Sequence, residues 1–423
     1  MRKYEFAAGF IATPQSERWE EILSRAYAAK IRPKCLCKPS AEAPEVYIAA
    51  VRGAHVLKRM PFSGARHAPH CDHYEAPPEL SGLGQVSGSA IREDPDSDTT
   101  TLNLDFALTK GAARAQPAGG ATEHDSVRSD GTKLTLRATL HYLYDEAGLT
   151  RWSPRMRGRR SWAVVRRELL QAAANKLTKS KPLTDLLFIP EPYSSEQAAE
   201  ISAERARKLA RLTESPGSRM LLIAPVKHID QARFGHKLVL KHLPDMPLMV
   251  NDDLHKRLTE RFAVQLALWG QLDSTMLLLI GTISQPMAGL YALEAGCLAN
   301  VNGGWIPFET ANEYQLLEAL AERRYSKGLR YNLPGIKPLA SAVLHDTDEP
   351  TALYIVEADA SDEQRAAAEQ LATGSGLASW WWDVRKGLMP ALPGNTRQPP
   401  ATAEHTAPER CAPPEPASQA TNG

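Results

Sequence analysis

The stretches CLC (residues 35–37) and HAPHCDH (residues 67–73) hold three of the five cysteines and three of the twelve histidines of this chain. Thiolates and imidazoles are the usual ligands of tetrahedral zinc, and their clustering in one short segment is typical of a zinc site. We therefore predict a zinc site formed by Cys35, Cys37, Cys71 and one of the nearby histidines.

The sequence between the two stretches predicts a β-hairpin, with short strand-like runs at residues 46–51 and 55–60. A hairpin alone is only marginally stable in water, so an ion that joined its two ends would supply folding free energy. This argument makes the zinc structural, because four protein ligands leave no open position for water. The alternative is that these are ordinary thiols and surface histidines that bind no ion.

Three histidines compete to be the fourth ligand. His67 stands four residues before Cys71, which is a common ligand spacing. His73 would complete a Cys-x-Cys and Cys-x-His arrangement similar to that of SWIM-type zinc fingers. His70 is adjacent to Cys71 and has the poorest geometry. The spacing leaves both His67 and His73 open.

Composition sets broad limits on the class of protein. A chain of 423 residues has room for two or three domains, and a net charge of +1 argues against a globally basic nucleic-acid binder. The opening MRKYEF lacks the apolar stretch of a secretory signal, and no run of about twenty apolar residues is long enough to cross a bilayer. We expect a cytoplasmic protein without a membrane partner, in a compartment where clustered cysteines bind metals more often than they form disulfides.

We predict an α+β multidomain chain. The expected parts are an N-terminal helix (1–30), a zinc-binding β region (31–110), a disordered loop (111–131), a basic helical segment (132–215), an α/β domain (216–393) and a disordered tail (394–423). The loop and the tail are rich in Gly, Ala, Pro and polar residues, which bury too little apolar surface to offset the chain entropy lost on folding.

The middle segment is strongly basic. Residues 151–181 contain seven arginines and three lysines against one acid, Glu168, a local charge of 10 − 1 = +9. Helical patterns on both sides of a turn resemble a helix-turn-helix or winged-helix element, and such a charge density is typical of surfaces that neutralise phosphates. The predicted DNA contacts are Arg151, Arg155, Arg157, Arg159, Arg160, Arg166 and Arg167. Alternatively, these arginines form a solvated helix face or pair with acids elsewhere in the fold.

The C-terminal region alternates helices with apolar runs of strand length, which predicts an α/β domain. Apolar residues at helical spacing predict one helix over residues 252–268, and Thr310 can cap a further helix. Its last elements resemble the core of PD-(D/E)XK nucleases, in which two carboxylates hold Mg²⁺ on the scissile phosphate and a lysine positions water. Glu313 and Glu357 are the weak catalytic candidates. Residues 339–342 (LASA) replace the expected metal-binding aspartate, and Asp359 stands where the lysine is expected. The resemblance is therefore to a degenerate nuclease core.

Several stretches together resemble one uncharacterised bacterial family, domain of unknown function 1173. They are RPKCLCKP (32–39), RHAPHCDHYEAPPELSGLGQVSGSAI (66–91), LHYLYDEAGLTRWSP (140–154), WIPFETANEYQLLEAL (305–320) and KGLRYN (327–332). The resemblance implies three conserved cysteines at Cys35, Cys37 and Cys71, and His67 rather than His73 as the fourth ligand. It also implies a setting on plasmids and integrative elements, and it implies no established activity.

Three functions follow as hypotheses. The leading one is a zinc-binding accessory protein of a mobile genetic element that contacts DNA through its basic segment. The second is a Mg²⁺-dependent nuclease of the PD-(D/E)XK type. The third is an adaptor for protein partners in a conjugation or plasmid-maintenance assembly.

Overall fold

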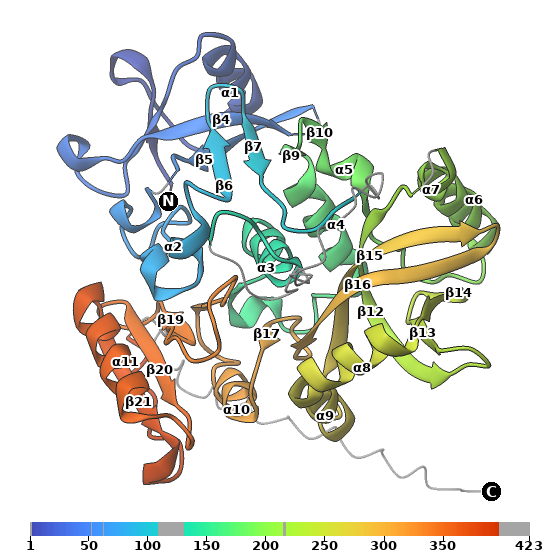
Figure 1. Cartoon of the computed structure of the whole chain (residues 1–423). Helices are drawn as coiled ribbons and strands as arrows, with labels where there is room; N and C mark the ends of the chain where they lie inside the picture. The colour runs from blue at the N-terminus through green and yellow to red at the C-terminus, as the bar shows by residue number, and fades with distance from the viewer. Residues whose placement is uncertain (1, 52, 62, 109–130, 215–216, 397–423) are drawn as a thin grey trace, which may run out of the picture.

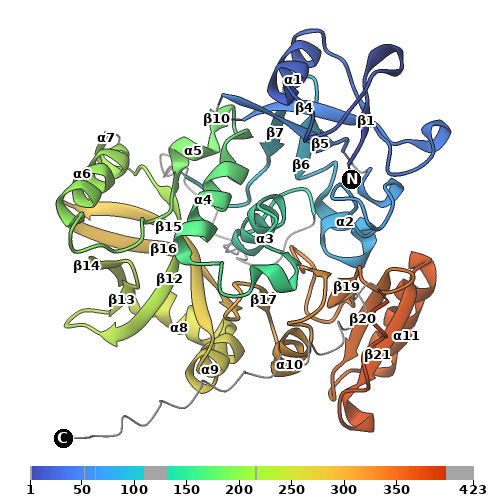
Figure 2. The same ribbon diagram turned by 180° about the vertical axis from the view of Figure 1, so that it is seen from behind.

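The computed structural model describes residues 2–108, 131–214 and 217–396, apart from positions 52 and 62 (Figures 1 and 2). The linker and the tail that we expected to be disordered fall almost wholly outside these ranges. The predicted mixture of helices and sheets is confirmed. No helix of the described residues is both long enough and apolar enough to cross a membrane.

The N-terminal part holds both cysteine-bearing stretches. It comprises a small sheet in the order β2-β1-β3, a separate two-stranded sheet, the helix α1 and the short helix α2. The predicted hairpin is confirmed as β4 and β5, which pair from Val46↔Arg59 to Val51↔Ala54. The elements are β1 (Tyr4–Glu5), η1 (Ala7–Gly9), β2 (Ile11–Ala12), α1 (Trp19–Ala28), β3 (Lys34–Cys35), η2 (Ser40–Glu42), β4 (Val46–Val51), β5 (Ala54–Arg59), η3 (Gly64–Arg66), η4 (Pro78–Leu80) and α2 (Leu83–Val86).

Helix α3 (Leu136–Glu146) lies at the centre of the molecule (Figures 1 and 2). The Thr135 hydroxyl caps it by accepting from the backbone N–H of Ala138. Every residue from Ala138 to Tyr144 is buried, as expected of a helix surrounded by other elements. A helix buried in this way cannot be laid against DNA.

The predicted helix-turn-helix is not confirmed, because its parts belong to different layers. Helix α4 (Trp162–Ala173) forms where expected, but β8 (Arg151–Trp152), before it, pairs with the C-terminal sheet. The strands after it join a four-stranded sheet in the order β10-β9-β7-β6. The remaining elements here are η5 (Pro154–Met156), β6 (Ile91–Asp94), β7 (Thr99–Leu102), β9 (Lys176–Thr178), β10 (Lys181–Pro182) and α5 (Leu183–Leu186).

Five strands close into a barrel, because β12 pairs with β13 along its second half and with β15 along its first half. Around the barrel the order is β12-β13-β14-β16-β15, and β14 with β16 is the parallel pair. Sequence patterning predicted one helix over residues 252–268; the chain forms two, which meet at Phe262. The elements are β12 (Met220–Gln231), β13 (His236–Leu240), β14 (Leu243–Val250), α8 (Asp252–Arg261), α9 (Ala263–Gln271), β15 (Met276–Met287) and β16 (Leu290–Val301), with β11 (Leu187–Phe188), β17 (Pro307–Phe308), α6 (Ala198–Leu209) and α7 (Arg211–Glu214) around them.

The C-terminal sheet has the order β21-β20-β19-β18-β8. Strands β18, β19 and β20 are antiparallel neighbours, and β21 is parallel to β20 across a connection through α11. Thr310 caps the preceding helix, α10, as predicted, by accepting from Glu313 N. The elements are α10 (Ala311–Ala319), β18 (Tyr325–Lys327), β19 (Ala342–Leu344), β20 (Thr351–Val356), α11 (Asp362–Ser375), β21 (Ala378–Asp383) and η6 (Val384–Lys386).

Candidate functional site

The four side chains Cys35, Cys37, His67 and Cys71 converge on one point. One ligand atom from each lies within 4.8 Å of the other three. The Sγ atoms of Cys35 and Cys71 are 3.5 Å apart, and His67 Nδ1 lies 3.5 Å from Cys37 Sγ and 3.7 Å from Cys71 Sγ. Ligands of a tetrahedral zinc–thiolate centre stand about 3.8 Å apart, given Zn–S bonds of about 2.3 Å. The geometry therefore suits a metal ion such as zinc.

Local backbone turns produce this convergence. Cys35 ends β3, and Cys37 follows it two residues later at the edge of the small sheet. The short helix η3 ends at Arg66, directly before His67, and the Cys71 N–H donates to the carbonyl of Ala68 in a tight turn. The hairpin β4–β5 returns the chain between the two turns, so the centre joins both ends of the hairpin as predicted.

The surroundings favour negative charge on Cys71, whereas burial raises the pKa of Cys37. Backbone N–H groups of Ala68 and His73 donate to the Sγ atoms of Cys37 and Cys71. A hydrogen bond from the Cys35 thiol lowers the pKa of Cys71 to about 3, while the same shared proton and burial raise the pKa of Cys35. Thiolate is the form that binds metal, so Cys71 is prepared for a cation, while Cys35 and Cys37 would release their protons when the ion binds.

The three histidines near Cys71 differ in their position relative to the sulfurs. His67 is buried and directs Nδ1 at the sulfurs, whereas its buried Nε2 has no hydrogen-bond partner among the described residues. The His73 Nε2 atom is hydrogen-bonded to the hydroxyl of Tyr4 at 2.9 Å. His70 is exposed. The structure therefore brings His67 into the cluster and leaves His73 as a neighbour of it.

Most of the predicted DNA-contacting arginines have partners inside the protein. Arg160 donates to the carbonyl oxygens of Leu149, Arg151 and Gly304, and its guanidinium lies 5.5 Å from the centre of the Trp152 ring. Four more of these arginines form ion pairs, which are Arg151–Glu75, Arg157–Glu322, Arg166–Glu191 and Arg167–Glu168. Arg155 and Arg159 are exposed and have no ion-pair partner among the described residues. Much of the +9 charge is thus paired within the protein, as the alternative interpretation held, although Arg157 and Arg167 are each more than half exposed.

A cleft of about 910 Å³ separates the metal centre from the turn that carries Arg155. Cys71 and Asp72 line one wall, and Arg155 and Met156 line another. Four of its five carboxylates are ion-paired within the protein: Asp72, Glu75, Glu322 and Asp346. Arg324 also lines this cleft and is exposed. Sequence analysis missed Arg324 because it lies far from the basic segment along the chain.

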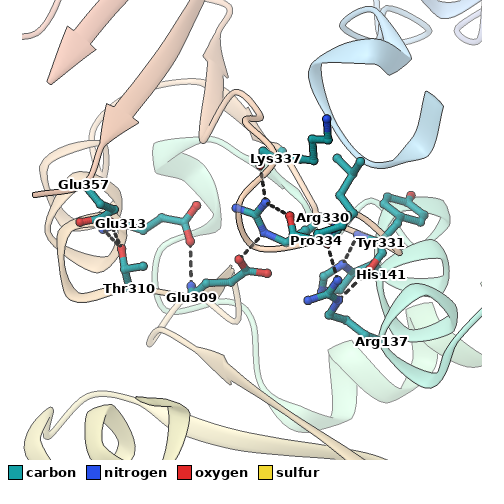
Figure 3. Close-up of polar contacts among 12 residues, drawn as sticks. Arg137, His141, Glu309, Thr310, Glu313, Arg330, Tyr331, Pro334, Lys337 and Glu357 are labelled. Atoms are coloured by element: carbon teal, nitrogen blue, oxygen red, sulfur yellow. Dashed lines mark hydrogen bonds and ion pairs between the residues drawn. The ribbon is translucent and has the colours of Figure 1, made fainter. Parts of the chain in front are cut away.

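A second cleft, of about 880 Å³, holds both weak catalytic candidates, Glu313 and Glu357 (Figure 3). Glu313 accepts from Lys327 Nζ at 2.6 Å and from the N–H of Glu309 at 2.7 Å. Glu357 accepts from the Thr310 hydroxyl at 2.7 Å. Each carboxylate therefore has its own partners. Among the described residues, the cysteine–histidine centre is the one group of three or more potential ligands close enough to share an ion.

The deeper wall of this cleft is a buried ionic network. Arg330 Nε donates a hydrogen bond to Glu309 Oε2 at 2.6 Å, and His141 Nδ1 accepts one from the backbone N–H of Tyr331 (Figure 3). Although burial alone would raise it, the charges of Arg330 and Arg137 lower the pKa of Glu309 to about 2. Burial lowers the pKa of His141 to about 3, so this histidine is neutral at pH 7.

Comparison with known proteins gives one family. No curated protein and no solved structure matches the chain. Residues 7–385 match a protein family of unknown function, DUF1173. Since this match spans most of the sequence, the chain belongs to the DUF1173 family.

Proposed function

We propose that this chain is a zinc-binding accessory protein of a mobile genetic element, and that it contacts DNA without cutting it. The observation that carries the proposal is the convergence of Cys35, Cys37, His67 and Cys71, with ligand atoms within 4.8 Å of one another. Three sulfurs and one nitrogen favour zinc over the hard cations that prefer oxygen. Four protein ligands give the zinc a structural role. The mobile-element setting rests on the family resemblance alone.

The cleft beside the metal centre supports DNA contact. Arg155 and Arg324 line it without ion-pair partners among the described residues, while four of its five acids are already neutralised. An incoming phosphate would therefore meet excess positive charge. Because Cys71 belongs to the opposite wall, the zinc would also fix the shape of this cleft.

Metal analysis tests the first half of the proposal. Protein purified under reducing conditions should hold about one zinc ion per chain, and Cys37→Ser should lose it. Cys411→Ser, which changes a cysteine outside the described residues, is the matched control and should keep the metal. Wild-type protein that contains no zinc and takes up none would disprove a zinc centre.

DNA binding as a function of salt tests the second half. Anisotropy with a labelled duplex should give affinity that falls with added salt, at a slope of about 0.9 per phosphate contact. The double variant Arg155→Ala/Arg324→Ala should flatten that slope by about 1.8. The control variant Arg25→Ala/Arg92→Ala removes equal charge from exposed positions outside the cleft and should leave the slope unchanged. Equal slopes for both double variants would remove this cleft as the DNA site.

A Mg²⁺-dependent nuclease is the second candidate, favoured by the location of Glu313 and Glu357 in one cleft. Strand and helix order, with β18 to β20 antiparallel and β21 parallel to β20, also suits such a core. The Lys327 contact to Glu313 and the absence of an aspartate at residues 339–342 weigh against it. Cleavage that needs Mg²⁺ and disappears with Glu357→Gln would establish the nuclease.

A further inference from the structure

The barrel of strands β12 to β16 has a distinctive topology. Its first three strands form an antiparallel meander, helices α8 and α9 follow, and the last two strands close the barrel. The first strand pairs with the fourth, and the third runs parallel to the fifth. OB barrels have this arrangement, and they bind ligands on the face of their second and third strands, between the loops after the first and fourth strands.

The corresponding face is formed by β13 and β14. Side chains alternate along a strand, and on β13 the buried Leu238 and Leu240 face the barrel core. Lys237 and Val239 therefore face outward. By the same alternation Pro247 and Met249 on β14 face outward, and Lys237 is directly opposite Met249. The outer face combines partly exposed apolar surface with a cation.

The loops at both sides of this face present exposed apolar side chains. Phe234, at the tip of the β12–β13 hairpin, is 78% exposed, and the guanidinium of Arg233 lies 5.5 Å from the centre of its ring. Met287, at the end of β15, is 68% exposed. Both hairpins project from the same side of the molecule, with β13 and β14 between them (Figures 1 and 2).

The charge of this region is positive. Four exposed cations have no ion-pair partner among the described residues: Lys227, Arg233, Lys237 and Lys241. Of the neighbouring acids, Asp245 is ion-paired with Arg205. Asp230 and Asp252 lie 3.1 Å and 3.5 Å from ring nitrogens of His228 and His236. The four cations outnumber these two aspartates, so a polyanion would find unpaired cations along β13 and at both of its ends.

We propose that the β13–β14 face, with Phe234 and Arg233 at its rim, binds single-stranded nucleic acid. Single strands expose base faces that stack on an aromatic ring, while cations follow the phosphates. A duplex hides its base faces and gains nothing from Phe234. This site is separate from the cleft beside the metal centre, and it goes beyond the duplex contact proposed there.

Anisotropy with a labelled thymidine oligonucleotide of about 16 nucleotides tests the site. Phe234→Ala should weaken binding at least about fivefold, and Phe234→Trp should restore it, because stacking contributes roughly 1–3 kcal/mol per base. Lys237→Ala/Arg233→Ala should flatten the salt dependence by about 1.4, at about 0.7 per single-strand phosphate. Phe10→Ala, which removes another exposed phenylalanine in the small N-terminal sheet region, should bind normally.

The outcomes separate this site from the cleft. Arg155→Ala/Arg324→Ala should leave oligonucleotide binding intact, and the barrel variants should leave duplex binding intact. A uridine oligonucleotide of equal length distinguishes RNA from DNA as the preferred strand, and tighter binding of either supports the site. Wild-type protein that binds neither strand, or Phe234→Ala binding as tightly as wild type, would overturn the proposal. So would a dimer that Phe234→Ala separates, since a second copy would then cover this face.

Discussion

The Nζ atom of Lys327 lies 2.6 Å from Oε1 of Glu313, and the two side chains are only 3% and 9% exposed. Lys327 ends β18 and Glu313 stands in the first turn of α10, so the ion pair joins the C-terminal sheet to the helix before it. The ammonium group neutralises the acid that a nuclease of the expected type would use for metal binding. The pair therefore has a structural role, which is to hold α10 against the C-terminal sheet at this cleft.

Lys327→Met tests this structural role. Loss of one partner leaves a buried charge uncompensated, so we expect the free energy of unfolding in urea to fall by about 3–5 kcal/mol. Lys337→Met changes an exposed lysine on the same cleft and should stay within about 0.5 kcal/mol of wild type. Equal stability of both variants would contradict the role given to the ion pair.

Gly82 joins the N-terminal part to the loop that carries Arg330. Its N–H donates to the carbonyl of Leu329 at 2.8 Å, and a Cβ there would collide with the carbonyl oxygen of Arg330. Backbone cannot move aside as a flexible side chain does, so Gly82→Ala should lower the free energy of unfolding by about 1–3 kcal/mol. Gly270→Ala, in α9 with open space around it, should be neutral or stabilising. Thermal unfolding of the two variants makes the comparison.

Asp145 should make stability depend on pH. Burial, and then the charge of Glu75, raise its pKa from 3.8 to about 6. Between these two values the folded protein holds a proton that the unfolded chain has lost, so the Asp145 contribution is complete below about pH 4 and is lost as the pH rises to about 6. Wild type should therefore lose up to about 3 kcal/mol of unfolding free energy relative to Asp145→Asn as the pH rises over this interval. A constant difference from pH 4 to pH 7 would show that Asp145 titrates normally.

Metal removal should loosen one region of the chain. The centre joins the ends of a two-stranded hairpin whose other support is its packing against α1, so chelation should expose residues 36–73 to protease. We expect cleavage there to rise severalfold with chelator in wild type and in Cys411→Ser. Cys71→Ser should be cleaved fast with or without chelator. Protection that chelator does not change would mean that the hairpin folds without the ion.

The elements near the cysteines were predictable because their signals are local. The hairpin β4–β5, the cap at Thr310 and the ligand cysteines all follow from residue types at short spacings. Strand β18, by contrast, has three residues and no apolar run, and one helix predicted over residues 252–268 breaks at Phe262. Such short elements form because tertiary contacts override local preference.

By itself, the sequence determined the family, the three cysteines of the metal centre and the α+β class, since these depend on residue identity and local periodicity. Spacing left His67 and His73 both open and the family resemblance favoured His67, but only the tertiary structure shows which imidazole points at the sulfurs, because that direction depends on the surrounding fold. Tertiary structure also determined which cations of the basic segment are paired with acids. Lys176, counted among its ten cations, is buried 2.7 Å from Glu146, a partner thirty residues away that no count of local charge reveals. Conversely, the cations near Phe234 lie on one local hairpin, but strands far apart in the chain had to close into a barrel before the β15–β16 hairpin with Met287 could lie beside β13 and β14.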